Sequence, residues 1–210
     1  SAPWCRGLEL TSRTDAEMPR PAVMLRQASR LAPFEGGLPP FLKVSAEMIW
    51  SRDGWLELSY GVLATASSGL ADLVISDGLI DGRQTNGERR DGLWTTTCFE
   101  AFLALPGCRD YWEINLSASG DWALYRFDDY RQGQHPQELA EAPLIRLRRW
   151  HHQLRLDARV PLVPWWPDEI CPDLALSCVL DRGEAGLSHW ALRHPQLKAD
   201  FHDRSTFLKA

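Results

Sequence analysis

Apolar and polar residues alternate with a period of two along several short segments of the chain, as they do in strands that bury one face. In residues 56–62, polar or small residues separate four apolar ones: Leu56, Leu58, Tyr60 and Val62. Turn-bounded runs predict further strands over residues 97–103, 111–117, 122–127, 154–160, 174–180 and 187–192. Short strands at this spacing favour an all-β fold, either a sandwich or a barrel.

The chain has the length and composition of a single domain. Its 210 residues are 44% apolar and 24% charged, and a chain of this length forms a core without disulfides or a structural metal. Because six of the 14 prolines precede residue 41, we expect residues 1–24 to be a disordered leader or a remnant of expression, and residues 25–210 to be one β-domain. The five cysteines are odd in number and lack C-x-x-C spacing, so we expect buried, reduced thiols.

Charge and hydropathy disfavour two classes of partner. No apolar run approaches the roughly 18–20 residues of a membrane-spanning helix, and the first residues lack the layout of a secretory signal, so we expect a cytoplasmic protein with no membrane partner. The net charge of −5 gives no general attraction to phosphate, so we expect no nucleic-acid partner. The basic residues 146–155 could bind a single strand, but His151 and His152 among them resemble an exposed hairpin turn. The oligomeric state stays open.

Motifs for several reactions are missing from the sequence. It contains no glycine-rich phosphate loop, no G-x-S-x-G nucleophile elbow and no H-E-x-x-H zinc motif. His189 and His194 are an odd number of residues apart, so one regular strand would direct them to opposite faces and they would not share a metal ion. We therefore predict a protein that is not an enzyme and holds no metal.

Two predicted strands place a pair of glutamates on one face of a hairpin. If residues 97–103 and 111–117 pair and bury their apolar faces, the opposite face carries Glu100, Glu113 and Asn115. Like charges at this spacing are destabilising unless an arginine, a cation or a polar ligand compensates them. A solvated face with weak ion pairs is the alternative interpretation, and a metal site is another. Glycoside hydrolysis also uses two carboxylates, but nothing in the sequence marks either glutamate as an acid or a nucleophile.

The third strand, residues 122–127, is expected to extend this polar face. With Tyr125 and Phe127 directed inward, Trp122 and Arg126 would join the two glutamates. An aromatic side chain beside carboxylates and an amide suits a sugar, because a sugar ring has an apolar C–H side and a rim of hydroxyls. The polar face of the hairpin is therefore a candidate carbohydrate site.

Tryptophan is several times more frequent than usual, with ten residues, or one in 21. Trp112 takes a core position by alternation, and Trp165 and Trp166 lie between prolines in a loop that covers a core. The tryptophans that remain as candidates for ligand contact are Trp94, Trp122 and Trp190.

Three segments of the chain resemble a known superfamily. Residues 91–103, in which Trp94 precedes a strand that carries Glu100, resemble the strand motif of the DOMON-like superfamily, which includes the family-nine carbohydrate-binding modules. Residues 111–131 and 187–202 resemble a bacterial subgroup of that superfamily.

This resemblance implies an immunoglobulin-like antiparallel β-sandwich. In the sugar-binding relatives a pair of tryptophans encloses the ligand; here Trp94 matches the motif tryptophan, and Trp190 would supply the second wall. Our leading hypothesis is a non-catalytic protein that binds a saccharide or a related polar ligand. Its ligand-binding residues would be Trp94, Glu100, Glu113, Asn115, Trp122, Arg126 and Trp190.

Haem is the alternative ligand, because other DOMON relatives hold the iron of haem b with a methionine and a histidine. The three methionines lie near the N-terminus, so such a pair would have to use Met48, with His194 or His202 as the histidine. On the leading hypothesis no cofactor is expected. A third hypothesis is a protein-interaction domain that uses an exposed sheet face.

Overall fold

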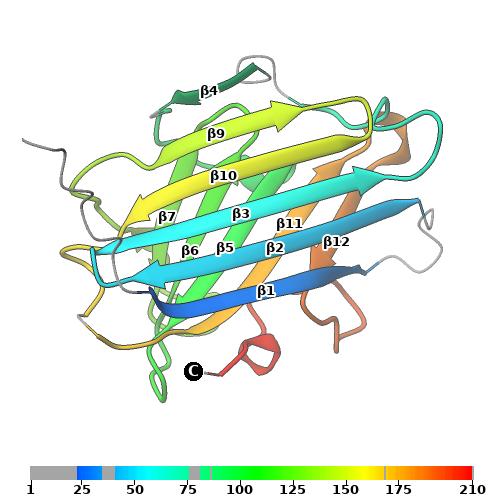
Figure 1. Cartoon of the computed structure of the whole chain (residues 1–210). Helices are drawn as coiled ribbons and strands as arrows, with labels where there is room; N and C mark the ends of the chain where they lie inside the picture. The colour runs from blue at the N-terminus through cyan, green and yellow to red at the C-terminus, as the bar shows by residue number, and fades with distance from the viewer. Residues whose placement is uncertain (1–22, 35–40, 76–80, 86, 168, 210) are drawn as a thin grey trace, which may run out of the picture.

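The computed structural model describes residues 23–34, 41–75, 81–85, 87–167 and 169–209 (Figure 1). Within these residues the strands are β1 (Val23–Pro33), β2 (Leu42–Ser51), β3 (Trp55–Ala64), β4 (Asp81–Thr85), β5 (Cys98–Ala104), β6 (Tyr111–Ser117), β7 (Trp122–Phe127), β8 (His135–Pro136), β9 (Leu144–Arg149), β10 (Gln153–Pro161), β11 (Asp173–Asp181) and β12 (Leu187–Ala191). Three short 3₁₀-helices accompany them: η1 (Leu93–Thr95), η2 (Gly183–Ala185) and η3 (Arg204–Thr206). No helix in the described part of the chain is long and apolar enough to cross a membrane.

The strands form one antiparallel sheet, in the order β4-β9-β10-β3-β2-β1-β12-β11-β5-β6-β7-β8. β1 pairs with β2 along most of its length, but Ala32 and Pro33 at its end pair with β12 instead. At this junction the sheet curls back, so that the first half, from β4 to β1, lies over the second half, from β12 to β8 (Figure 1). The all-β class is confirmed; the immunoglobulin-like sandwich stays a prediction.

Apolar side chains from both halves fill the space between them and form the main core. Met48 and Leu58 of the first half and Phe99 and Ile114 of the second half are all at most 1% exposed. Burying a side chain of this size stabilises a fold by about 1.5–3 kcal/mol. This core explains the alternation of buried and partly exposed residues in β2, β3 and β10.

The second half is also covered on its outer face, which points away from the main core. Every residue of β5 and β6 is buried. A second apolar cluster lies on this outer face, and residues of the C-terminal segment 192–209 belong to it. Phe207 of that segment packs on Phe102, while Tyr111 and Phe127 stack with their ring centroids 4.9 Å apart. The outer face of the second half therefore combines sheet residues with an irregular segment from the end of the chain.

The predicted hairpin of residues 97–103 and 111–117 is confirmed. β5 and β6 pair antiparallel, with Glu100 opposite Asn115 and Phe102 opposite Glu113. The expected turn at residues 150–152 also joins two paired strands, β9 and β10.

The strands predicted from the sequence do not include β1 and β2, nor the shorter β4, β8 and β9. From Leu25 to Ala32 less exposed and more exposed residues alternate in β1, but the less exposed positions include the polar Gln27 and Ser29, so hydropathy does not reveal the strand. β2 does alternate, and the pattern could have been used to find it. Of the expected leader, residues 1–22 lie outside the described residues, and Val23 and Met24 begin β1.

The face expected for β7 is wrong. Trp122 and Arg126 were expected beside the two glutamates, but β7 pairs with β6 so that Arg126 lies opposite Trp112. Both side chains therefore lie on the core side of the second half, where Trp122 packs against the main core and Arg126 lies 5.5 Å from the Trp112 ring centre. Residues 118–121 connect β6 to β7 and set this register, with the Ser117 N–H donating to the Asp121 carbonyl oxygen; a shift of one residue would exchange the two faces of the strand.

Candidate functional site

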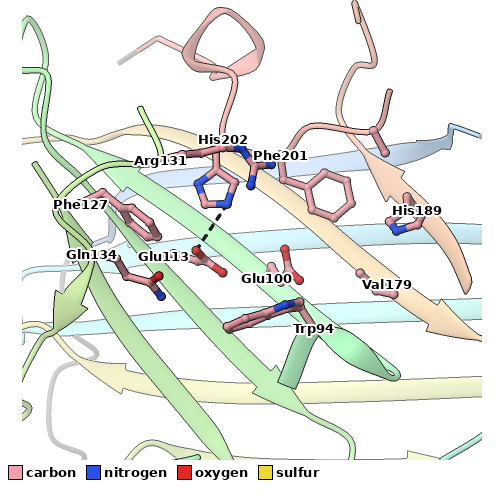
Figure 2. Close-up of a pocket in the computed structure, with 11 residues that line it drawn as sticks. Trp94, Glu100, Glu113, Phe127, Arg131, Gln134, Val179, His189, Phe201 and His202 are labelled. Atoms are coloured by element: carbon pink, nitrogen blue, oxygen red, sulfur yellow. Dashed lines mark ion pairs between the residues drawn. The ribbon is translucent and has the colours of Figure 1, made fainter. Parts of the chain in front are cut away.

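A pocket of about 360 Å³ opens on the outer face of the second half (Figure 2). Its lining residues are Trp94, Glu100, Glu113, Phe127, Arg131, Gln134, Val179, His189, Ala199, Phe201 and His202. Strands β5, β6, β7, β11 and β12 supply five of these residues; η1, the loop 128–134 and the C-terminal segment supply the others. The carboxylates therefore stand on paired strands, and irregular segments form much of the wall.

Glu100 and Glu113 project from the same face of the β5–β6 hairpin. Because Glu100 is opposite Asn115 and Glu113 is opposite Phe102, the two glutamates are diagonal neighbours, at a spacing of about 7–8 Å between Cα atoms. Only 3% of Glu100 and 5% of Glu113 is exposed, although both line the pocket. The hairpin thus holds two acidic side chains out of bulk water, where an ionised carboxylate is costly.

Each carboxylate accepts one hydrogen bond from a side chain of the described residues. Asn115 Nδ2 donates to Glu113 Oε1 at 2.8 Å, and Ser177 Oγ donates to Glu100 Oε2 at 3.4 Å. Burial raises the pKa of Glu113 to about 7. Burial, and then the charge of Glu113, raise the pKa of Glu100 well above its usual range. Near neutral pH the pair therefore holds at least one proton.

His202 reaches the pocket from the C-terminal segment and lies between Tyr111 and Glu113. Its Nδ1 atom is 2.8 Å from the Tyr111 hydroxyl, which also accepts the Arg131 amide N–H at 3.2 Å. Burial lowers the pKa of His202 to about 4, and burial raises that of Tyr111 to about 12. A neutral imidazole that accepts a hydrogen bond from the Tyr111 hydroxyl at Nδ1 carries its single N–H at Nε2.

The Nε2 atom of His202 points toward Glu113, as the dashed line in Figure 2 shows. The 3.7 Å between Nε2 and Glu113 Oε2 is longer than a direct hydrogen bond. Because His202 is neutral near neutral pH, this contact is not an ion pair in that range. In the tautomer that accepts the Tyr111 hydrogen bond at Nδ1, Nε2–H is a donor directed at the pocket floor, beside the carboxylates.

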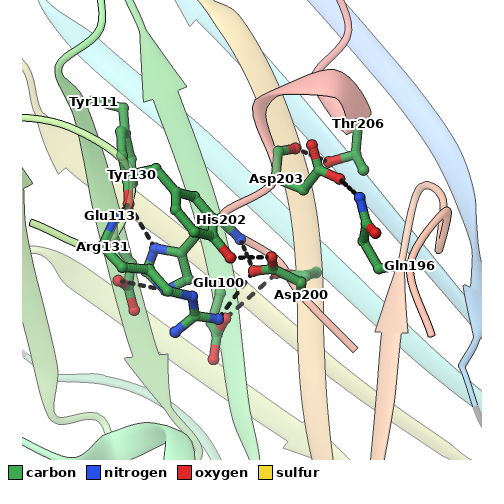
Figure 3. A network of polar contacts seen from close by, with 11 residues as sticks. Glu100, Tyr111, Glu113, Tyr130, Arg131, Gln196, Asp200, His202, Asp203 and Thr206 are labelled. Atoms are coloured by element: carbon green, nitrogen blue, oxygen red, sulfur yellow. Dashed lines mark hydrogen bonds and ion pairs between the residues drawn. The ribbon is translucent and has the colours of Figure 1, made fainter. Parts of the chain in front are cut away.

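A polar network joins the loop 128–134 to the C-terminal segment (Figure 3). Asp200 accepts hydrogen bonds from Arg131 Nη2 at 2.9 Å, from the Tyr130 hydroxyl at 2.6 Å and from the His202 amide at 3.1 Å. Burial by itself would raise the pKa of Asp200, but these hydrogen bonds and the Arg131 charge outweigh burial and lower that pKa. Asp200 thus ties together the two irregular segments that form one wall of the pocket.

Replacing Asp200 with alanine is expected to loosen this wall. We expect the free energy of unfolding to fall by about 1–2 kcal/mol, because three hydrogen bonds are lost, two of them from partly exposed side chains. Amide hydrogen exchange should become faster in residues 129–134 and 199–203 but not in β5. Unchanged exchange in these segments would show that Asp200 does not hold them together.

Trp94 forms the opposite, aromatic wall (Figure 2). It lies in η1 and is 40% exposed. The indole makes an edge contact with the Tyr125 ring at 6.2 Å, and the Tyr125 hydroxyl donates to Asp91. Gly92, at φ 76°, permits the left-handed conformation with which this helix begins. One side of the indole is thus supported by packing while the residue remains open to solvent.

The structure brings together several of the residues expected from the sequence. Trp94, Glu100 and Glu113 line one pocket, as proposed for a ligand site. Asn115 is fully buried and contacts Glu113, so it supports the carboxylate and does not line the pocket. His202, considered only as a haem ligand, lines the pocket as well.

Trp190 does not form the expected second wall. It is 3% exposed and belongs to the main core, where its indole N–H donates to Ser188 Oγ at 3.1 Å. Trp190 pairs with Cys178 across β11 and β12, whereas the preceding residue, His189, pairs with Val179 and faces the pocket. Strand alternation thus gives the pocket a histidine where a tryptophan was expected.

The Met48 and histidine pair expected for haem is not formed. Met48 is fully buried in the main core, between the two halves of the sheet. His202 lies on the outer face of the second half, so that half separates the two side chains. His194 is directed elsewhere: its Nε2 atom is 2.8 Å from the Ala32 carbonyl oxygen. In the described residues, no group of three or more His, Cys, Asp or Glu could hold a metal ion.

Other pocket residues were not identified from the sequence. Arg131 and Gln134 lie in a loop, and Phe201 lies in the C-terminal segment, where no periodic pattern predicts the direction of a side chain. Phe127 was expected to face the core of the hairpin, but the register of β7 directs it to the pocket. His189 could have been found from alternation, had Trp190 been assigned to the core.

Comparisons with known proteins support the fold. No protein-family model and no curated protein sequence matches the chain. Among solved structures, a "putative carbohydrate-binding protein" from Bacteroides uniformis is similar, with a TM-score of 0.51 and 12% sequence identity over 86% of this chain and 84% of that one. At this identity the similarity shows a shared fold. The chain therefore has the all-β fold of that protein, and the DOMON-like assignment stays a prediction.

Proposed function

We propose that the protein binds a small polyhydroxylated ligand, a saccharide, in the pocket of Figure 2, and that it does so without catalysing a reaction. The observation that carries this proposal is the exposed indole of Trp94 beside two buried carboxylates in one pocket. The volume of about 360 Å³ lies at the lower end of the range of about 300–1,000 Å³ for small-molecule sites, which suits a short saccharide.

The polar groups of the pocket complement sugar hydroxyls. Glu113, half ionised near pH 7, can accept a hydrogen bond from a sugar hydroxyl, while the protonated Glu100 can donate one. His202 Nε2–H adds a further donor. The apolar C–H side of a sugar ring can pack against Trp94, which keeps part of its surface exposed.

Two other findings support this choice of ligand. The structural neighbour from Bacteroides uniformis is described as carbohydrate-binding. The resemblance of residues 91–103 to the DOMON-like motif points in the same direction, and we include a DOMON-like, immunoglobulin-like sandwich in the proposal.

Titration calorimetry with a panel of mono- and oligosaccharides tests the proposal. We expect Trp94→Ala to weaken binding at least tenfold, which corresponds to about 1.4 kcal/mol, because the ring loses its stacking surface. Trp150→Ala is the matched control. The exposed fraction of Trp150, 49%, is similar to the 40% of Trp94, but Trp150 does not line the pocket. No heat with any saccharide, or equal affinities for Trp94→Ala and the wild type, would contradict the proposal.

A further inference from the structure

Two glutamates and one arginine line the pocket. Glu100 and Glu113 face the same cavity as the guanidinium of Arg131. That guanidinium already contacts Asp200 at 2.9 Å. His202 is neutral near neutral pH, and so adds no positive charge. Without a ligand, the Arg131 charge offsets the two carboxylates in part, and a retained proton reduces the repulsion that remains.

An ammonium group on a ligand would satisfy the same two carboxylates. It supplies three N–H donors, while each carboxylate has about four acceptor positions and accepts one side-chain hydrogen bond from the described residues. Aromatic rings at Trp94, Phe127 and Phe201 line the same pocket and can interact favourably with a cation. Buried acids beside aromatic rings are a suitable environment for an organic cation. A neutral sugar can form hydrogen bonds there but carries no positive charge to balance the carboxylates.

We propose that the pocket selects ligands with a protonated amine, which lies between Glu100 and Glu113, so that an amino sugar with a free amine is preferred over its neutral counterpart. This inference names the ligand class of the pocket and rests on the proposed function. It predicts that N-acetylation abolishes the preference, because the amide nitrogen carries no positive charge.

Binding of such a ligand should release protons. An ammonium beside the carboxylates favours their ionised forms, so the proton that the pair holds goes to the buffer while the ammonium keeps its own. The titratable groups near the pair are Tyr60, Cys98, Tyr111, Tyr125, Arg131, Cys178, His189, Asp200 and His202. Replacing one glutamate isolates the contribution of the pair from these neighbours.

The experiment compares glucosamine, glucose and N-acetylglucosamine by calorimetry, and likewise the galactose and mannose series. The titrations are run at about pH 6.5, so that both the amine and the carboxylate pair are protonated before binding. Each titration is made in phosphate and in a buffer with a larger heat of ionisation, because the difference in heat between the two buffers measures the protons released. We expect the amines to bind at least tenfold more tightly than both neutral counterparts, with release of protons. Glu113→Gln should weaken this preference and lower the number of protons released, because Glu100 remains as the one buried acid of the pair. Glu57→Gln, on the outer face of the first half, should change neither.

The outcomes separate this inference from the proposed function. If neutral sugars bind as tightly as amino sugars and release no protons, the amine preference is wrong and the saccharide function stands. If cyclohexylamine binds as tightly as the amino sugars while no neutral sugar binds, the saccharide function is wrong and the ammonium site stands. If no compound binds, both are wrong.

Discussion

Replacing Trp190 with alanine is expected to lower the free energy of unfolding by about 3–5 kcal/mol, the range for truncating a buried aromatic side chain. Trp190 is 3% exposed in the main core, so its removal leaves a cavity and also removes its hydrogen bond to Ser188. Trp94→Ala should change the same quantity by about 1 kcal/mol or less, because Trp94 is 40% exposed.

Urea denaturation of both variants, followed by circular dichroism, measures this contrast. The two substitutions remove the same atoms, so a difference between them reports the surroundings of each tryptophan. Ligand binding should show the opposite order, since Trp94 lines the pocket and Trp190 does not. A loss for Trp94→Ala as large as that for Trp190→Ala would mean that Trp94 is a packing residue and would weaken the case for a ligand wall.

Glu113→Gln is expected to stabilise the empty protein by about 1–3 kcal/mol at pH 8 and to have little effect at pH 4. The folded-state pKa of Glu113 is raised to about 7, from an ordinary value of 4.5. Between these values the folded state binds more protons than the unfolded state, so stability falls as the pH rises through this window. The full penalty is present above pH 7, where the carboxylate is ionised in both states. Glutamine carries no charge, and its oxygen can still accept from Asn115.

Urea denaturation of the wild type and the variant from pH 4 to pH 8 tests this expectation. His202 changes the free energy of unfolding in the opposite direction, because its folded-state pKa of about 4 lies below the ordinary 6.5. Between these values the unfolded state binds more protons, so stability falls as the pH falls from 6.5 to 4. The difference between variant and wild type removes the part of the His202 contribution that does not depend on Glu113, whose Oε2 atom is 3.7 Å from His202 Nε2. Glu57→Gln, at a partly exposed glutamate of β3, is the matched control. A constant difference across the pH range would contradict a buried, perturbed carboxylate at Glu113.

The sequence predicts the positions of site residues where two neighbouring strands both alternate clearly between apolar and polar residues. Glu100 and Glu113 were placed correctly because β5 and β6 each show a consistent pattern, and both faces of their hairpin follow from it. Trp122 and Arg126 were misplaced because the face of β7 depends on the length of one turn, which propensities do not determine.

Two other parts of the site have no periodic signal. Trp190 was assigned to the pocket by resemblance, although alternation within β12 allowed either Trp190 or His189 to face it. Arg131 and His202 lie in irregular segments, where the direction of a side chain follows from tertiary contacts: Arg131 contacts Asp200, and His202 contacts Tyr111. These contacts join residues 69 and 91 positions apart in the sequence and have no local signature.

Because paired strands form the floor of the pocket and irregular segments form one wall, substitutions in the floor and in the wall have different consequences for the fold. The strands fix the acidic floor, and a substitution there also disturbs a region that is buried on both sides. The loop 128–134 and the C-terminal segment form a wall that does not belong to the sheet. Relatives could therefore acquire different ligands through insertions or substitutions in these two segments while they keep the same framework, which would let recognition diverge faster than the fold.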